Sequence, residues 1–193
     1  HDRGRARPTR LPTLGKTTLR RWAGKHLESL NSALPDDAAE LVLYVDEFSN
    51  YNDTSLGITT IRFFNRLGIR VIIVMHPVSG RTYISKGLLK KAKQIARKNV
   101  KILSKEVCAG RPLVGIEPSA ILGFRDEFPE LVGKDMKVLA EELSKYCFTL
   151  EEYLDNAFEK GVFDSTLFTK EKVQLKLHGH CQQKSIASTA PTK

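Results

Sequence analysis

LVLYVDEFSN, residues 41–50, joins a continuous apolar run to a polar loop. A run that is apolar at every position is typical of a β-strand covered on both faces, as in a parallel sheet. Residues 71–75 and 113–116 form two further apolar runs, and each also leads into a polar loop. Residues 173–177 alternate between apolar and polar side chains, which predicts a fourth strand exposed on one side.

Helical periodicity fills the sequence between these runs. Apolar residues recur at helical spacing from 56 to 67, from 83 to 103 and near 134–146. Thr149 and Glu152 have capping-box spacing for a further helix. Strands that alternate with helices pair in parallel through right-handed crossovers. We therefore predict an α/β fold with an open, mainly parallel sheet of about four strands and flanking helices, a Rossmann-like three-layer arrangement.

The composition is that of an ordinary globular protein. The chain has 193 residues, 41% hydrophobic and 27% charged, which fits one domain with a tail. No apolar stretch approaches the length of a membrane span. The three cysteines form no CxxC pair and no even disulfide framework, which favours a reducing, cytoplasmic setting.

Positive charge is concentrated at the N-terminus. Residues 1–26 carry eight Lys or Arg and one acid, whereas the rest of the chain has 23 basic and 21 acidic residues. We interpret residues 1–35 as a basic linker with a short helix near 18–30, ahead of an α/β domain at 36–184 and a disordered tail at 185–193. An arm that binds nucleic acid or acidic membranes is the alternative. The lysine-rich segment 90–101 is interpreted as a solvated helix face.

Four polar loops should lie together at the carboxyl ends of the strands. In an open parallel sheet these ends converge on one crevice, where ligands bind. The loops are 46–50, 76–81, 117–119 and 178–181. Asp46 and Glu117 could act as acid or base, although carboxylates in such places more often cap helices.

The other loop residues offer further chemistry. Residues 76–81 could hold an anion through Gly80 and Arg81, or form a plain turn into the next helix. His178, His180 and Cys181 are ligand types for zinc or iron, yet one short loop cannot direct all three at one ion. Ser119 has no GxSxG surroundings, so a hydrolase triad is not predicted. Packed or incidental roles are predicted for the remaining cysteines, Cys108 and Cys147.

At these same loops the chain resembles the cysteine-rich CCG domain that ends FAD-linked oxidases with fused iron–sulfur modules. Related domains occur in the iron–sulfur subunits of glycolate and lactate oxidation systems and in heterodisulfide reductase. The resemblance is carried by five segments, residues 43–51, 79–89, 114–120, 124–127 and 178–184. It implies half of a CCG domain: a degenerate first repeat and the start of a second.

The chain departs from the family's cysteine pattern. Asp46 stands near the first cysteine position, Val78-Ser79-Gly80 replaces Cys-Cys-Gly, and Ala120 takes the later place. Of the second copy only Cys181 remains. One thiolate cannot hold an iron–sulfur cluster, which normally needs four ligands.

The resemblance implies a site and a set of partners. Cys181 would be the metal ligand, and the other residues of the cofactor site would be His178, His180, Asp46, Ser79, Arg81 and Glu117. The intact parent would carry an iron–sulfur cluster, with FAD in another domain, and this fragment would bind neither. FAD-binding and ferredoxin-like domains or subunits of the same enzyme are the expected partners; no nucleic acid is expected, and peripheral membrane contact stays open.

Two functions follow as expectations. The first is the electron-transfer domain of an FAD-linked 2-hydroxy-acid oxidoreductase of the glycolate or lactate type, inactive alone. The second is a non-catalytic scaffold or docking domain that has lost its cluster ligands. Whether the chain by itself is an enzyme is left open by the sequence.

Overall fold

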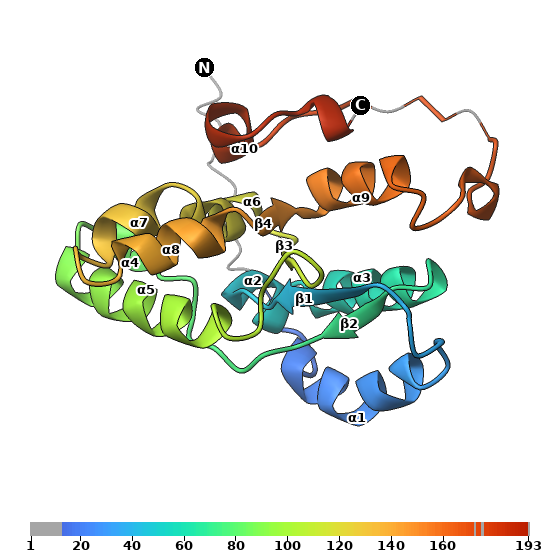
Figure 1. The fold of residues 1–193 in the computed structure, drawn as a ribbon, viewed down its shortest axis with the longest axis horizontal. Coiled ribbons are helices and arrows are strands. Elements are labelled where there is room, and N and C mark those ends of the chain that lie inside the picture. The colour runs from blue at the N-terminus through green and yellow to red at the C-terminus, as the bar shows by residue number, and fades with distance from the viewer. Residues whose placement is uncertain (1–12, 172, 175, 193) are drawn as a thin grey trace, which may run out of the picture.

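The computed structural model describes residues 13–171, 173–174 and 176–192, and its centre is a four-stranded sheet (Figure 1). All pairs are parallel and the order is β2-β1-β3-β4. The strands are β1 (Glu40–Tyr44), β2 (Arg70–Ile72), β3 (Leu113–Gly115) and β4 (Cys147–Thr149). The predicted α/β class is therefore confirmed.

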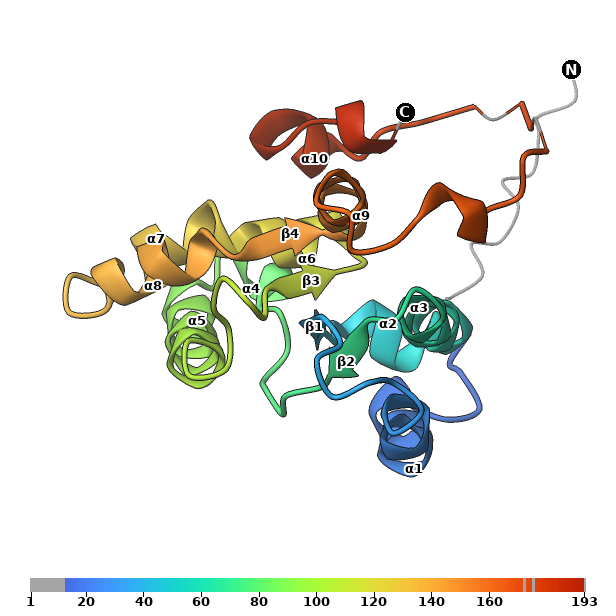
Figure 2. The same cartoon turned by 45° about the vertical axis from the view of Figure 1, so that its right-hand side comes forward.

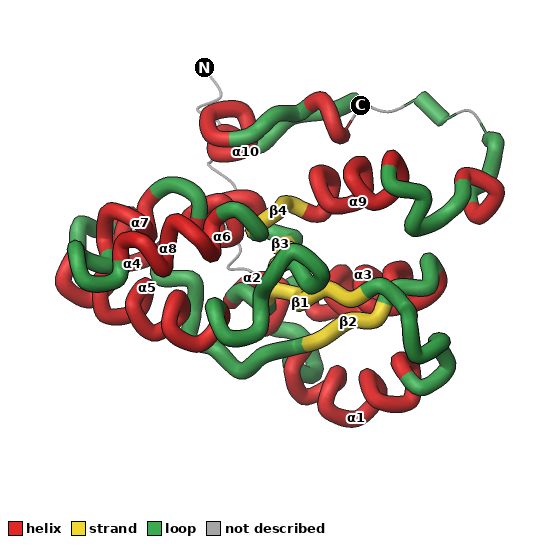
Figure 3. The backbone as a smooth tube through the Cα atoms, in the orientation of Figure 1, coloured by secondary structure: helices red, strands yellow, loops and turns green. Residues whose placement is uncertain are grey.

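Helices make up most of the described chain (Figure 3). The longer ones are α1 (Leu19–Asn31), α3 (Thr54–Arg66), α5 (Leu89–Leu103), α8 (Lys137–Ser144) and α9 (Leu150–Glu159). Short helices follow the strand ends or close the chain: α2 (Glu47–Tyr51), α4 (Arg81–Ser85), α6 (Pro118–Ile121), η1 (Leu122–Phe124), α7 (Glu127–Leu131), η2 (Ser165–Leu167), α10 (Cys181–Ile186) and η3 (Ala190–Thr192).

The sheet is covered on both faces (Figure 2). On one face, α5, α7 and α8 pack against Val42 and Tyr44 of β1. On the other, α1, α3 and α9 pack against Leu41 and Leu43. Side chains alternate between faces along a strand, so a strand buried on both sides is apolar at every position. This explains the continuous run that begins at Leu41.

The fourth strand was predicted in the wrong place. The described residues of the segment 173–177 (Val173, Gln174, Lys176 and Leu177) lie outside any strand, and β4 is formed by Cys147–Thr149 instead. Alternating polarity suits a strand, but a strand also needs a neighbour to pair with. β3 supplies that neighbour for residues 147–149, whereas none of the described strands pairs with 173–177.

The capping and glycine patterns of the sequence correctly predicted two helix ends and missed one break. Thr149 and Glu152 form the predicted capping box of α9. Gly68 stops α3 with a φ of 79°, a left-handed conformation that glycine adopts without steric cost. The single helix predicted for 83–103 is two helices, because the chain turns at Gly87 with a φ of 70°.

The C-terminal part crosses back over the domain. After α9 the chain runs away from the sheet and returns to place α10 beside α6 and η1 (Figure 1). α1 lies within the region interpreted as a linker, and its Leu19 and Ala23 are buried in the core. The proposed boundaries at 35 and 184 and the disorder of the tail stay predictions. None of the helices in the described residues is long and apolar enough to cross a membrane.

Candidate functional site

A cleft of about 520 Å³ lies at the carboxyl ends of the strands. We call it the strand-end cleft; its lining residues are Phe48, Asp53, Arg81, Thr82, Ser85, Lys86, Glu117, Ser119 and His180. The chain leaves β1 for β2 on one side and reaches β3 on the other, so the sheet has its topological switch point between β1 and β3. Ligands of open α/β sheets bind outside such a switch point.

Asp46 follows β1 and caps α2. Its Oδ1 accepts hydrogen bonds from the backbone of Phe48 and Ser49, and its Oδ2 accepts one from the Ser49 hydroxyl at 2.8 Å. Burial raises the pKa of Asp46, while the hydrogen bonds from Ser49 and Phe48 oppose that shift. The contacts of Asp46 are therefore those of a helix cap. Asp46 does not line the strand-end cleft.

Ser79 is held by Glu47 across the β1 and β2 loops. The backbone N–H of Ser79 donates to Glu47 Oε2 at 2.9 Å, and its hydroxyl donates to Glu47 Oε1 at 2.7 Å. Ser79 is buried, and its hydroxyl in turn accepts from the backbone of Arg81. Ser79 thus ties the loop after β2 to the loop after β1.

Arg81 links three segments that are far apart in sequence. Its guanidinium forms an ion pair with Glu127 of α7 and donates to Gln182 Oε1 of α10 at 3.3 Å. Gln182 Nε2 also reaches Glu127 Oε1 at 3.4 Å. A hydrogen bond to a charged group is stronger than a neutral one, so this triangle fixes α10 against the domain.

Glu117 and His180 face each other in the cleft. Glu117 caps α6 by accepting from the backbone and the hydroxyl of Ser119, the latter at 2.7 Å. His180 Nε2 lies 3.6 Å from Glu117 Oε1, while its Nδ1 accepts from the backbone of Gln182. The structure therefore brings Arg81, Glu117 and His180 together in the cleft. Arg81 and Glu117 follow β2 and β3, whereas His180 comes from the N-terminus of α10 and not from a strand end.

His76 lies in a neighbouring cavity of about 240 Å³. Its Nδ1 is 2.6 Å from the carbonyl oxygen of Pro77, so Nδ1 carries the proton and donates. Its Nε2 then accepts from the backbone N–H of Val45 and from Arg20. Burial, and next the positive charge of Arg20, lower the pKa of His76 to about 4. The ring is neutral at physiological pH and stacks on Tyr44 at 4.3 Å.

Arg20 ties α1 to these strand ends. Its Nη1 donates to the carbonyl of His76 at 2.9 Å and its Nη2 to that of Val45 at 3.3 Å. Asn50 adds a second link by accepting from the backbone N–H of Arg20. A helix from the basic N-terminal region thus anchors the loops after β1 and β2.

The described residues do not supply the ligands of an iron–sulfur cluster. All three cysteines are free; Cys108 and Cys181 are exposed and Cys147 is buried. Burial raises the pKa of the Cys147 thiol, which donates to the carbonyl of Leu143, so a packing role is supported for it. Within the part of the chain that the structure describes, no three His, Cys, Asp or Glu side chains gather as a metal site. Four ligands are the norm for a cluster.

His178 and Cys181 lie at the rim of this region. His178 is exposed, and Cys181 is the exposed first residue of α10, next to Gln182. Neither residue lines the strand-end cleft. Their roles as cofactor or metal ligands remain predictions.

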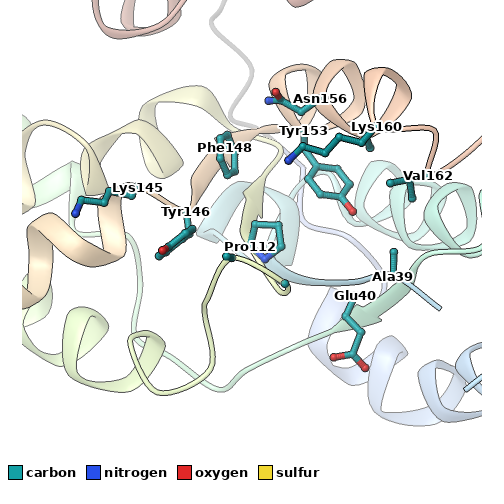
Figure 4. A pocket seen from close by; sticks show the side chains of 13 residues that line it. Ala39, Glu40, Pro112, Lys145, Tyr146, Phe148, Tyr153, Asn156, Lys160 and Val162 are labelled. Carbon is teal, nitrogen blue, oxygen red and sulfur yellow. The ribbon is translucent and has the colours of Figure 1, made fainter. Parts of the chain in front are cut away.

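A second pocket, of about 330 Å³, lies at the opposite ends of the strands (Figure 4). Phe148, Pro112 and Tyr153 form an apolar wall, and Lys160, just after α9, projects along its rim. Burial raises the pKa of Tyr153 to about 12. The carboxylate of Glu40 at this pocket is paired with two arginines, Arg70 and Arg111. The facing pair Glu117 and His180, in contrast, lies at the strand-end cleft.

Sequence reasoning did not single out several residues that build the site. Arg20 was counted only as part of the basic arm, and Glu127 and Gln182 only as parts of matching segments. These residues matter because they contact segments that lie far away in the sequence. Periodicity and motif spacing report only on neighbouring residues, so they do not reveal such contacts. Glu47 carried a local signal, since it directly follows a strand, but its partner Ser79 lies 32 residues away.

Comparison with known proteins finds similarity to dehydrogenases. The chain is 27% identical to D-2-hydroxyglutarate dehydrogenase of Escherichia coli over 191 residues, 95% of the chain and 18% of that protein. The corresponding protein of Haemophilus influenzae is 26% identical over 194 residues, again 95% of the chain and 18% of its own length. A component of the anaerobic glycerol-3-phosphate dehydrogenase of Escherichia coli is 27% identical over 69% of the chain and 33% of that component.

These relatives are much longer than the chain, which spans about a fifth to a third of their length. No family model matches, and no solved structure matches. The finer resemblance to CCG domains therefore stays a prediction. The relation to oxidoreductases is supported, because the D-2-hydroxyglutarate and the glycerol-3-phosphate relatives are both dehydrogenases. The chain is therefore an α/β domain related to oxidoreductases.

Proposed function

We propose that this chain is part of an FAD-linked 2-hydroxy-acid dehydrogenase and serves there as a docking domain for the redox modules. The observation that carries the proposal is the similarity of 95% of the chain to D-2-hydroxyglutarate dehydrogenases. The match to the anaerobic glycerol-3-phosphate dehydrogenase extends over less of the chain, 69%. A 2-hydroxy acid is therefore the proposed substrate class of the parent enzyme.

A docking role is favoured by what stands in the family's cysteine positions. Asp46 caps α2 through Oδ1 while its Oδ2 accepts from the Ser49 hydroxyl, and Ser79 bridges two loops. The side chains of Asp46 and Ser79 both form hydrogen bonds to other protein atoms. Neither is a soft thiolate ligand of the kind that binds an iron–sulfur cluster. The first repeat has the contacts of a rigid framework, and its surface would carry the neighbouring domains.

An electron-transfer role is the second candidate, and the position of Cys181 favours it. Cys181 is exposed at the start of α10, and Gln182 beside it is fixed by Arg81 and Glu127. A thiol held at the rim of a cleft could join ligands from another segment or subunit. In that case Cys181 would be one ligand of a shared cluster.

Metal analysis of the isolated chain is the first test. Iron, zinc and acid-labile sulfide are measured per chain on protein purified without oxygen. The docking proposal predicts less than about 0.1 equivalent of each. Iron together with sulfide near stoichiometry would overturn it in favour of electron transfer, and zinc alone would point to a different metal site at His178, His180 and Cys181.

The second test uses the parent dehydrogenase and a matched pair of cysteine variants. Cys181→Ser removes the candidate ligand, and Cys108→Ser removes an exposed thiol of the turn before β3. For a docking domain, cluster content and turnover with a 2-hydroxy acid stay unchanged in both variants. Loss of cluster iron in Cys181→Ser alone would contradict the docking role and support ligation.

A further inference from the structure

The outer face of α5 is strongly basic. Its sequence, LKKAKQIARKNVKIL, contains six Lys or Arg and no acidic residue. Ala92, Ile95, Ala96, Asn99, Val100 and Leu103 are buried, so the opposite side of the helix faces solvent. Lys90, Lys91, Lys98 and Lys101 are exposed and lie within about 100° of one another around the helix axis. We call these four residues the α5 lysine face.

Acidic neighbours do not neutralise this face. Asp135 pairs with Arg97, and Glu130 pairs with Lys137. Glu106, just beyond the helix, pairs with Arg111. Within the described part of the chain, none of the four lysines forms an ion pair. Four free ammonium groups therefore lie along about 16 Å of one helix side.

An apolar knob stands at the N-terminal end of the same helix. Leu88 and Leu89 are 52% and 54% exposed. They follow the turn at Gly87 and, together with Tyr83, Lys90 and Lys91, line a surface groove of about 480 Å³. Single exposed leucines are common, but here two adjacent ones share a groove with Lys90 and Lys91, so apolar and basic side chains lie together. α5 lies at the edge of the molecule (Figure 2).

We propose that the α5 lysine face and the Leu88–Leu89 knob together bind the surface of an anionic lipid bilayer. The lysines would contact lipid phosphates and carboxylates, and the two leucines would enter the boundary between headgroups and acyl chains. Clusters of basic side chains attract anionic lipid surfaces, and exposed apolar side chains beside them gain burial at the headgroup boundary. The inference does not depend on the proposed dehydrogenase function.

The chemistry favours a lipid surface over a nucleic acid. Arginine forks and stacking aromatic rings dominate nucleic-acid recognition, whereas this face presents lysine point charges. Exposed leucines gain nothing against a phosphodiester backbone but gain apolar burial in a bilayer. The binding surface also adjoins the strand-end cleft, because Lys86 lines the cleft and immediately precedes the turn at Gly87.

Vesicle co-sedimentation of the full 193-residue chain tests the proposal. Vesicles of phosphatidylcholine with about 30% phosphatidylserine are compared with phosphatidylcholine alone, at about 0.1 M salt. The variant Lys90→Gln/Lys98→Gln/Lys101→Gln is expected to lower the partition coefficient on the order of 100-fold. The charge-matched control Lys160→Gln/Lys170→Gln/Lys176→Gln changes exposed lysines outside α5, and it should lower binding no more than about 3-fold because distant charges are screened.

A second variant separates lipid from other anionic partners. Leu88→Ser/Leu89→Ser should lower partitioning on the order of 10-fold while leaving its salt dependence unchanged. The same double variant should not affect binding to a duplex oligonucleotide. If the two triple lysine variants lose vesicle binding equally, the proposal is overturned, because binding then depends on overall charge or on the basic arm. No effect of the serine variant, with tighter binding to the oligonucleotide than to vesicles, would overturn it in favour of nucleic acid.

Discussion

Protonation of His76 should destabilise the fold at mildly acidic pH. The imidazole is buried and receives hydrogen bonds at Nε2 from Val45 and Arg20, so its neutral form fits the site. Its pKa is about 4 in the folded protein, against an ordinary value of 6.5. Unfolded chains therefore bind the proton more readily between these values. The stabilising contribution is complete above about pH 6.5 and is lost as the pH falls toward 4, by about 3 kcal/mol in total.

The assay is urea unfolding followed by circular dichroism from pH 4 to 8, on the wild type and on His76→Gln. Glutamine can donate and accept hydrogen bonds but does not titrate, so the advantage of the wild type over the variant should shrink by about 3 kcal/mol between pH 7 and pH 4. Asp46 and other titrating groups are present in both proteins, so their contributions largely cancel in the difference. Substitution of the exposed His26 by Gln serves as the control. Parallel stability profiles for wild type and His76→Gln, or a folded-state pKa of His76 near 6.5 by NMR, would refute the reasoning.

Three further substitutions test the local geometry. Asp46→Ala should lower the free energy of unfolding by about 1 kcal/mol through loss of the α2 cap, whereas Asp46→Asn should retain most of it; equal losses would contradict capping. Arg81→Ala leaves Glu127 without its cation and Gln182 without a donor, so we expect a loss of about 1–3 kcal/mol and faster amide exchange in α10; unchanged exchange would show that α10 is held by other contacts. Gly115→Ala would place a Cβ against Ile121 in the core and should cost about 1–3 kcal/mol in urea unfolding; a neutral result would mean that α6 shifts freely.

The strands that the sequence located share a local signature. β1, β2 and β3 lie in apolar runs, and the covering of both sheet faces makes such runs conspicuous. β4 has three residues, Cys147–Thr149, too few to show a period. Residues 173–177 show a clearer period but have no strand partner in the described chain. Pairing is a non-local property, so periodicity alone chose the wrong segment.

The site was predictable as far as topology determines it. The carboxyl ends of parallel strands meet at one edge, and this rule accounts for Arg81 and Glu117 lining one cleft. His180 also lines the cleft, but α10 carries it there by packing on α6, since the described residues of 173–177 form no strand. The rule could not predict which side chains at that edge contact one another. The ion pair of Arg81 with Glu127 depends on how α7 packs against the sheet, which no sequence spacing specifies.

Arg20 connects the N-terminal region to the chemistry at the strand ends. Its guanidinium donates to the carbonyls of Val45 and His76, and its charge helps to keep the His76 ring neutral. The same contact therefore serves two purposes: it fixes α1 on the sheet and sets the protonation state of a buried imidazole. Asp46, Ser79 and His76 are likewise held by internal hydrogen bonds, so the loops after β1 and β2 are fastened to each other and to α1 by the protein's own side chains. A single arginine thus couples the placement of an N-terminal helix to the protonation state of a histidine 56 residues further along the chain.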